Sequence, residues 1–282
     1  MKTPTSLLAI AILASAILST AQAANSIVVT YAESPKQETS TLSGTQVYNF
    51  NSVPLGLDTN VQWNGVGSFD QLYIMRPDQY GGATDATHPN GTDYSVQGVG
   101  TPVHSTTLTL STNSGYFGMW WSAGDAANVL DFYNGTKLVG EFTTANLLTK
   151  LGTAYNGNPR NTSLDSSEPF AFINFYGDAQ TTWNKIVLRN SGTSGFESDN
   201  YTTRVSTYNP ATDGATLPGI AVARVSGTTV TKLSPTATGA ALWGSASAVP
   251  GAPAPPLVLA ACFGVVALLK GRKGERNATA KA

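Results

Sequence analysis

Residues 129–142 read VLDFYNGTKLVGEF and contain the clearest local folding pattern in the chain. Two largely apolar segments of strand length flank the sequence Asn134-Gly135-Thr136. An Asn-Gly pair favours a type I′ turn, because both central residues of that turn need a positive φ. We therefore predict a β-hairpin here, with Asn134 and Gly135 as its two-residue loop.

Short strand-like segments recur on both sides of this hairpin, and Gly and Asn turn sequences separate them. The pattern predicts an all-β fold, an antiparallel β-sandwich resembling a jelly roll. One short helix is expected at residues 144–151, capped by Thr144 and ended by Gly152. The other predicted strands span residues 27–31, 46–50, 106–112, 116–122, 170–176, 185–190, 195–199 and 201–208.

The net charge of −1 over 282 residues hides a separation of charge along the chain. Residues 24–249 carry −6, residues 250–282 carry +4, and the first 23 residues add the charge of Lys2. An acidic body of this kind lacks the basic patch that nucleic-acid binding requires, so no nucleic-acid partner is expected. The single cysteine, Cys262, excludes an intramolecular disulfide and a cysteine-based metal centre.

The first 23 residues have the three parts of a signal peptide. Lys2 supplies a positive start, residues 7–18 form an apolar run, and Ala21-Gln22-Ala23 fits the small-residue cleavage pattern. We expect the Sec translocon to export the chain and signal peptidase to remove residues 1–23.

The other end of the chain carries a second apolar segment. Residues 24–234 are expected to form the folded ectodomain, and residues 235–249 a flexible linker. An apolar run at residues 257–269 follows, with a basic cluster directly after it. As a helix this run would rise about 20 Å, against a hydrocarbon core of about 30 Å. It is therefore expected to be a weak membrane anchor or a sorting signal, with its basic side in the cytoplasm.

This tail, residues 250–282, resembles the PEP-CTERM signal of exosortase-processed surface proteins. Val249-Pro250-Gly251-Ala252-Pro253 stands where that family has Pro-Glu-Pro, before the hydrophobic helix 257–269 and a basic end. The resemblance implies transient anchoring in the inner membrane, cleavage by a membrane exosortase, and delivery to the surface or extracellular matrix of a Gram-negative bacterium. The matching sorting residues are Val249, Pro250, Pro253, Lys270, Arg272 and Lys273.

The body also resembles ectodomains found in this family. The matching stretches are residues 115–125, 130–135 and 195–200. The last of them, GFESDN, is similar to the final-strand signature of jelly-roll modules that precede such tails. The resemblance implies a cell-surface protein and no particular reaction.

Few residues of the body suggest catalysis. His88 and His104 are expected to be surface or strand-end residues, because neither accompanies a nucleophile motif. Glycoside hydrolysis needs only two carboxylates about 5 to 10 Å apart. In the predicted hairpin register Asp131 and Glu141 point to opposite faces of the sheet, which argues against their acting as a pair. The candidate carboxylates are Asp125, Asp131, Glu141, Glu197 and Asp199.

Two residue sets could bind a ligand. Glu197 and Asp199 are two positions apart and share one face of a strand, where they could hold a structural Ca²⁺ or simply be solvated. No other cofactor is expected. Trp120, Trp121 and Tyr80 are candidates for carbohydrate contact through their flat aromatic faces. The adjacent tryptophans point to opposite faces of a strand, so we expect one in the core and one exposed.

These features predict a non-enzymatic, exported protein of the cell surface or extracellular matrix. Its β-sandwich would bind polysaccharide or mediate adhesion. The alternative is a secreted polysaccharide-active enzyme, a glycosidase or lyase that uses a carboxylate pair. A groove in which two carboxylates face each other would favour that alternative.

Overall fold

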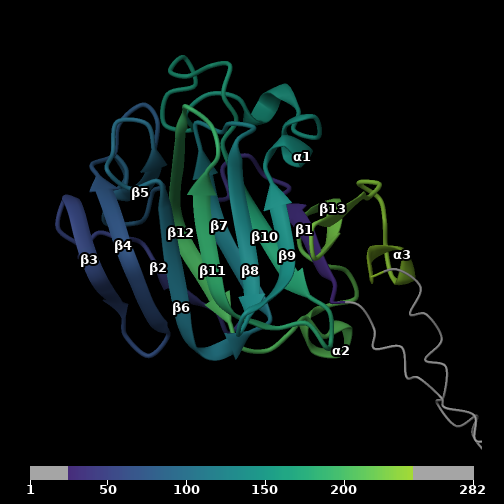
Figure 1. The fold of residues 1–282 in the computed structure, drawn as a ribbon. Helices are drawn as coiled ribbons and strands as arrows, with labels where there is room; N and C mark the ends of the chain where they lie inside the picture. The colour runs from purple at the N-terminus through teal and green to yellow at the C-terminus, as the bar shows by residue number, and fades with distance from the viewer. Residues whose placement is uncertain (1–24, 244–282) are drawn as a thin grey trace, which may run out of the picture. The chain divides into compact units, whose positions relative to one another are not determined.

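Fourteen β-strands make up the fold in the computed structural model, which describes residues 25–243 (Figure 1). Every pair of strands within the sheet is antiparallel. The predicted all-β antiparallel sandwich is thereby confirmed. None of the helices between residues 25 and 243 has the length and hydrophobicity needed to cross a membrane.

The strands and helices have the following bounds. The strands are β1 (Ile27–Tyr31), β2 (Gln46–Tyr48), β3 (Gly56–Trp63), β4 (Gly67–Met75), β5 (Tyr94–Gly98), β6 (Ser105–Ser114), β7 (Tyr116–Ser122), β8 (Asn128–Asn134), β9 (Lys137–Thr143), β10 (Ala171–Gly177), β11 (Trp183–Asn190), β12 (Gly195–Arg204), β13 (Ile220–Ser226) and β14 (Thr229–Lys232). The helices are α1 (Ala145–Leu148), the 3₁₀ turn Thr153–Tyr155, α2 (Pro210–Asp213) and α3 (Ala240–Trp243).

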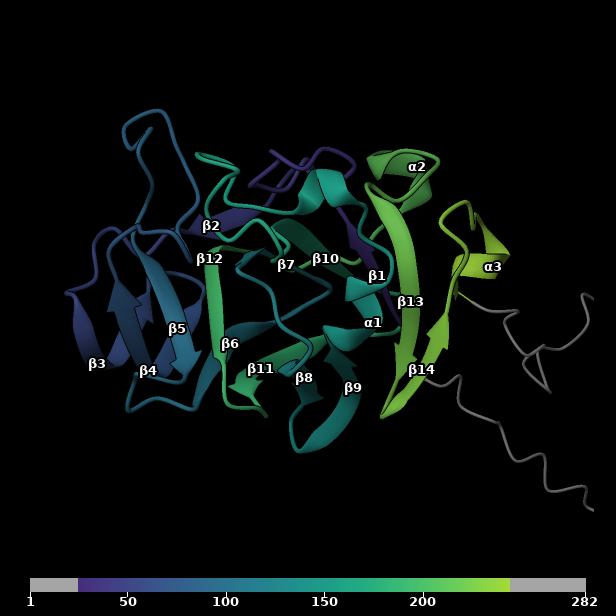
Figure 2. The same ribbon diagram turned by 90° about the horizontal axis from the view of Figure 1, so that it is seen from above.

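The strands form two facing layers that are joined along one side. The order of hydrogen-bonded neighbours is β14-β13-β1-β10-β7-β12-β5 and then β4-β6-β11-β8-β9. β4 pairs with β5 near its C-terminal end and with β6 near its N-terminal end, so the sheet passes between the layers at this strand. Figure 2 shows β3 and β4 at one side and β13 and β14 at the other. At the side of β13 and β14, the backbone of Gly227 hydrogen-bonds to Val139 and Glu141 of β9, so the two layers also meet at this side.

Large aromatic side chains fill the space between the layers. Phe132 lies at their centre, with its ring centroid 5.0 Å from that of Phe175 and 4.9 Å from that of Trp183. All three side chains are buried. Aromatic residues of this size each remove about 150–250 Å² from water, so such contacts dominate the energetics of the core.

The predicted hairpin forms from β8 and β9, but its turn and register differ from the prediction. Asn134 pairs with Lys137, so the two loop residues are Gly135 and Thr136. Gly135 has a φ of 60°, while Asn134 and Thr136 have no positive φ, which excludes the type I′ turn. A bulge follows Phe132 and shifts the pairing by one residue. A shift of one residue turns side chains to the other face of a strand.

This shift overturns the expected separation of Asp131 and Glu141. The two acids are direct cross-strand partners and therefore share a face. Arg189 of β11 bridges them, with its Nε 2.8 Å from Asp131 Oδ2 and its Nη2 3.1 Å from Glu141 Oε2. One guanidinium therefore contacts both carboxylates, and the group is an ion-pair network that links β8, β9 and β11.

Several elements differ from the prediction for local physical reasons. The strands β3, β4, β5, β13 and β14 have no predicted counterpart; β3 is an edge strand in which only Trp63 is buried. β12 runs without a break and lies inside its layer, so the GFESDN stretch is not in the final strand.

The helix at residue 144 is shorter than predicted, and two further short helices occur in the described range. The Thr144 side chain makes no cap hydrogen bond; its hydroxyl contacts the carbonyl oxygen of Asp125 and, at 3.1 Å, that of Asn128.

The folded domain continues past the boundary that we predicted at residue 234. Leu242 is buried and packs with Leu233 and Val28 in a second apolar cluster, and Ala237 and Trp243 pack against it. Residues 235–243 therefore belong to the domain, and the prediction of a flexible linker is wrong for them. The predicted signal peptide, residues 244–249 and the sorting signal lie outside the described residues.

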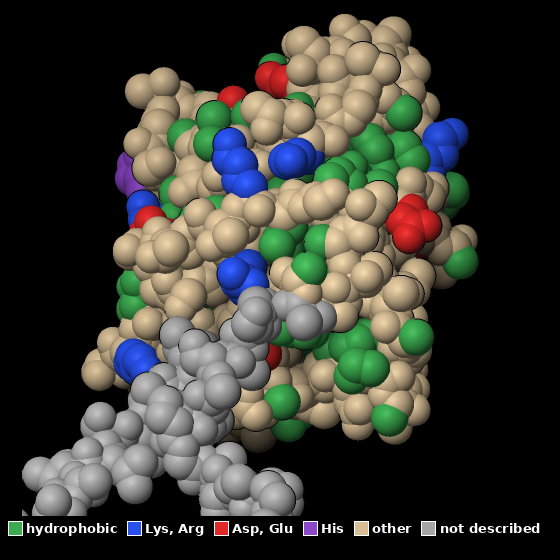
Figure 3. All heavy atoms as spheres, turned by 90° about the vertical axis from the view of Figure 1, so that its right-hand side faces the viewer, with side chains coloured by type: hydrophobic (Ala, Val, Ile, Leu, Met, Phe, Trp, Pro, Cys, Tyr) green, Lys and Arg blue, Asp and Glu red, His purple; other side chains and the backbone are tan. Residues whose placement is uncertain are grey.

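The two ends of the described segment lie together, because α3 contacts both β1 and β13. The surface on this side carries charged side chains that are spread out singly among uncharged atoms (Figure 3). Neither a continuous charged patch nor a broad apolar patch is visible on the described part of this face. The features that could hold a ligand are found elsewhere on the sandwich.

A close approach of two backbones at Gly67 provides a test of the sheet. A Cβ at Gly67 would overlap the carbonyl oxygen of Thr109 and lie 3.0 Å from Leu110 Cα. Because backbone cannot move aside as a flexible side chain can, we predict that Gly67→Ala lowers the free energy of unfolding by about 1–3 kcal/mol. Urea denaturation measures this change. Gly152→Ala is the control, since no atom lies within 4 Å of its added Cβ. Equal stability of the two variants would contradict the close approach.

Candidate functional site

A cleft of about 380 Å³ opens over β5 and β12, and we call it the tyrosine cleft because Tyr80 and Tyr94 line it. Phe196 of β12 points into the core, so Glu197 on the same strand points the other way, into the cleft. The remaining walls come from the β4–β5 loop, the β5–β6 loop and the loops that flank β7 and β10. Four stretches of chain that are distant in sequence, residues 75–101, 123–125, 168 and 194–197, therefore meet in this cleft.

Three carboxylic acids face the tyrosine cleft, each from a different segment: Asp125, Glu168 and Glu197. Burial is the main cause that raises the pKa of Glu197 to about 8; the charges of Asp125 and Glu168 act in the same direction, and a hydrogen bond from its own backbone N–H acts against them. Burial also raises the pKa of Glu168, with the charge of Asp125 adding to the effect. In the described part of the chain, every charged side chain lining this cleft is acidic.

A glycine makes room for the Glu197 side chain. A Cβ at Gly195 would overlap Glu197 Oε1, so the carboxyl group folds over residue 195 only because that residue has no side chain. In the described residues, neither oxygen of Glu197 bonds to another side chain. The carboxyl group is thus available to a ligand in the cleft.

Tyr80, one of the predicted carbohydrate contacts, lies in the lining of this cleft and is 43% exposed. Asp78 fixes its position: Oδ1 of Asp78 accepts hydrogen bonds from the backbone N–H of Tyr80 at 2.8 Å and from the Tyr94 hydroxyl at 2.9 Å. An aromatic ring is therefore held at the surface next to the three carboxyl groups.

The other two predicted contacts, Trp120 and Trp121, are both fully buried, so the expected exposed tryptophan is wrong. Trp121 faces the core between the layers, where its indole N–H donates to Asn128 Oδ1 at 2.7 Å. Trp120 points to the other face, as alternation predicts, but Phe170 and Ala83 cover it. Segments remote in sequence bury this face, and no pattern within β7 could have indicated that.

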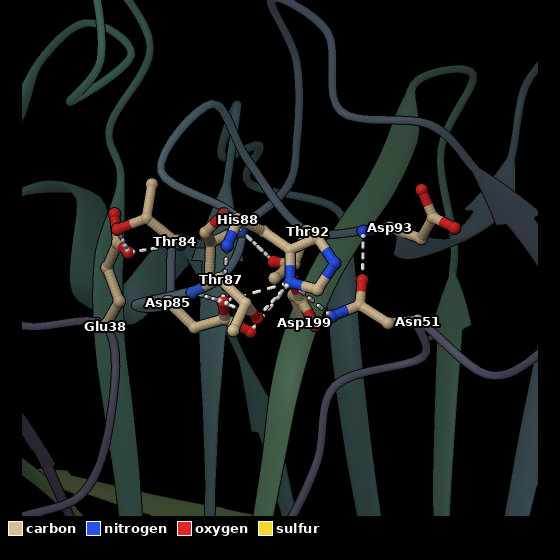
Figure 4. Close-up of polar contacts among 10 residues, drawn as sticks. Glu38, Asn51, Thr84, Asp85, Thr87, His88, Thr92, Asp93 and Asp199 are labelled. Carbon is tan, nitrogen blue, oxygen red and sulfur yellow. Dashed lines mark hydrogen bonds and ion pairs between the residues drawn. The ribbon is translucent and has the colours of Figure 1, made fainter.

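Glu197 and Asp199 share a face of β12, as predicted, but their surroundings differ. Figure 4 shows Asp199 beside Thr92. Asp199 is fully buried under the loop from Ala83 to Thr92. Its Oδ2 accepts from Ala83 N at 2.9 Å and from Thr92 Oγ1 at 2.5 Å, and its Oδ1 from Asn200 N at 2.6 Å. No group of three or more His, Cys, Asp or Glu residues able to hold a metal occurs among the described residues. Calcium at Glu197 and Asp199 stays a prediction, and the occupied oxygens of Asp199 count against it.

The hydrogen bonds around Asp199 also fit its protonated form. Burial raises the pKa of Asp199 to about 7, although its hydrogen-bond donors act in the opposite direction. The Thr92 hydroxyl has a single proton and lies 2.9 Å from the Ala83 carbonyl oxygen. If the Thr92 hydroxyl donates its proton to the Ala83 carbonyl oxygen, it has none left for Asp199. The contact between Thr92 Oγ1 and Asp199 Oδ2 is then a hydrogen bond donated by the protonated carboxyl group. Asp199 therefore acts as a buried link between the loop and β12.

Both histidines lie at the surface, as predicted. His88 belongs to the turn shown in Figure 4, where its Nδ1 lies 2.9 Å from Asp85 Oδ1. Despite an opposing effect of burial, hydrogen bonds from Thr87 and His88 lower the pKa of Asp85 to about 2. This cluster ties a surface turn together, and no serine or cysteine nucleophile is among its described partners.

Sequence reasoning found Asp125, Glu197 and Tyr80 separately and missed Glu168. Glu168 lies in a long loop before β10 that has no periodic pattern. Nothing in its neighbourhood, a Ser-Ser-Glu-Pro sequence, points to a site. Only the folded chain brings the four residues into one cleft.

No protein-family model matches the chain, and no curated protein matches it. Among solved structures, it is similar to the catalytic domain of a GH87 α-1,3-glucanase in complex with tetrasaccharides, with 15% sequence identity and a TM-score of 0.29. The similarity covers 67% of this chain and 30% of the glucanase chain. Neither a common fold nor a common function follows from a similarity of this level.

The buried carboxyl of Asp199 makes stability depend on pH. Because its pKa is raised in the folded chain, the stability it contributes is complete below about pH 4 and is lost as the pH rises through about 7. We predict that the free energy of unfolding falls over this range and that Asp199→Asn reduces the fall. Each unit of pKa difference between the folded and unfolded chain corresponds to about 1.4 kcal/mol. Urea denaturation between pH 4 and pH 8 measures the effect, and identical profiles for the two proteins would contradict it.

Proposed function

We propose that the chain is an exported protein of the bacterial cell surface or extracellular matrix whose β-sandwich binds polysaccharide in the tyrosine cleft. The observation that carries the binding part is the convergence of an exposed tyrosine with three carboxyl groups in one cleft. The proposal of export and delivery to the surface rests on the signal-peptide pattern of residues 1–23 and the sorting-signal pattern of residues 250–282.

The chemistry of the cleft suits a sugar. A sugar ring presents an apolar face, which can pack on the half-exposed ring of Tyr80, and hydroxyl groups at its edge. Carboxylate oxygens accept hydrogen bonds from hydroxyls, and the protonated carboxyl of Glu197 can also donate one. The volume of about 380 Å³ lies at the lower end of the range for small-molecule sites.

A specific observation also favours the enzymatic alternative. Glycoside hydrolysis requires one protonated and one ionised carboxyl across the scissile bond. Glu197, whose pKa is raised to about 8, would be the general acid, and Asp125 or Glu168 the second carboxylate. Release of reducing ends from a bound polysaccharide, and its loss in Glu197→Gln, would establish this second candidate over binding alone.

The proposed route to the surface uses partners at both ends of the chain. The Sec translocon and signal peptidase would act on residues 1–23, and an exosortase on the tail that contains Pro250, Pro253 and the basic cluster. In the described domain β1 and α3 lie together. The side that carries them would therefore face the membrane while the tail is attached.

Binding is tested with a glycan array and Tyr80→Ala. If the Tyr80 ring carries a sugar, its removal lowers the affinity for the polysaccharide that binds best by about tenfold, or about 1.4 kcal/mol. Tyr133→Ala is the matched control, because Tyr133 is a partly exposed tyrosine in β8 that lies outside the cleft. An array on which the wild-type protein binds no polysaccharide would overturn the proposed binding.

Processing is tested by mass spectrometry of protein extracted from the bacterial surface. We expect the mature chain to begin at Ala24 and to lack the apolar run 257–269, because signal peptidase and exosortase have removed the two ends. Exchange of the basic residues Lys270, Arg272 and Lys273 for alanine should leave the tail attached. Recovery of residues 257–273 in surface-extracted wild-type protein would contradict processing.

A further inference from the structure

We infer that the bound polysaccharide extends across two neighbouring clefts, so that the protein recognises an internal stretch of the polymer and not only one sugar. A second cleft of about 600 Å³ provides the additional space, and we call it the arginine cleft after Arg160 in its lining. The inference rests on the proposed function and adds the form in which the ligand binds.

Consecutive residues make the two clefts neighbours. Asp78 and Gln79 line the arginine cleft, and the next residue, Tyr80, lines the tyrosine cleft. Each residue of extended chain spans at most about 3.6 Å, so the two linings are only a few ångströms apart at this point. The loop before β10 contributes to both clefts as well, with Leu164 in one and Glu168 in the other. A ligand chain longer than one cleft would enter the other across Tyr80.

Arg160 makes the ridge between the clefts rigid. Its guanidinium donates to the backbone carbonyls of Asp78, Gly81 and Asn90, with the Gly81 bond at 2.8 Å. Asn158 adds a side-chain amide bond to the Gln79 carbonyl at 3.0 Å. A fixed ridge lowers the entropy that binding must overcome, since its residues are already ordered.

The arginine cleft presents groups suited to sugar hydroxyls. Glu38 lines it and is only 8% exposed; its Oε2 accepts from Thr84 N at 2.5 Å and from Thr84 Oγ1 at 2.6 Å. The other oxygen of Glu38 has no hydrogen-bond partner among the described residues. Gln79 and Asn90 add amide side chains that bond to no described residue, and amides both donate and accept. The second oxygen of Glu38 is not among the buried polar atoms that lack a partner, so it is accessible and can accept a hydrogen bond from a ligand hydroxyl.

The clefts differ in charge. The tyrosine cleft is lined by acids alone, whereas the arginine cleft combines Glu38 and Asp78 with the cations Lys36 and Arg160. A polymer that crosses Tyr80 therefore meets different groups on each side. This difference would fix the direction in which an asymmetric chain lies.

The test is a chain-length series on the purified protein. Oligosaccharides from disaccharide to octasaccharide are cut from the polysaccharide that binds best on the array, and their affinities are measured by calorimetry. We expect affinity to rise with length until both clefts are filled and then to level off. Gln79→Ala and Asn90→Ala should weaken octasaccharide binding by about tenfold and leave disaccharide binding unchanged, whereas Tyr80→Ala weakens both.

Gln180→Ala is the matched control, because Gln180 is an exposed amide in the turn after β10 and its side chain bonds to no described residue. It should change no affinity in the series. Equal affinity for all lengths, or equal loss of short and long ligands in Gln79→Ala, would overturn the two-cleft inference and leave polysaccharide binding intact. Absence of binding at every length would instead overturn the proposed function itself.

Discussion

The buried contact between Asp199 and the β4–β5 loop is the interaction on which the candidate site depends. Asp199 holds Ala83 and Thr92 against β12, so that the loop lies over the outer face of the sheet. Ala83 in turn covers Trp120. Residues 78–80, just before this attachment, separate the two clefts and line both. This attachment acts together with the bonds of Arg160 to the carbonyls of Asp78 and Gly81, which hold the same loop at its start.

Burial of the Asp199 carboxyl group is unfavourable, and the hydrogen bonds that it accepts compensate for part of that cost. A carboxyl group without solvent is unfavourable when ionised, and burial raises its pKa accordingly. Three donors surround it, however, and their own N–H and O–H groups would be unsatisfied if an apolar residue stood there. The network therefore specifies one loop position over others. Glu197, two residues earlier, has no such donors from other residues in the described chain and stays available to the cleft.

The position of a strand could be predicted where its own residues are rich in β-branched and aromatic side chains. β1 and β7 have the predicted bounds, because β-branched and aromatic residues are concentrated within them. The hairpin forms as predicted, but its register differs because a bulge after Phe132 shifts the pairing. Asp131 and Glu141 therefore share a face, where Arg189 pairs with both. Edge strands such as β3 were missed because their polar, exposed residues resemble loop sequence. Trp120 was misplaced because the segments that cover it are remote in sequence.

The sequence by itself determined the all-β class, the antiparallel pairing and the terminal patterns that predict export and sorting, because these follow from composition and from periodicity within short segments. It also singled out Tyr80, Asp125 and Glu197 as separate residues. Only the tertiary structure decided that they meet Glu168 in one cleft, that Asp199 is buried and that a second cleft adjoins the first. The physical reason is that burial and proximity depend on which distant segments pack over a strand, and a strand's own residues do not encode what covers them.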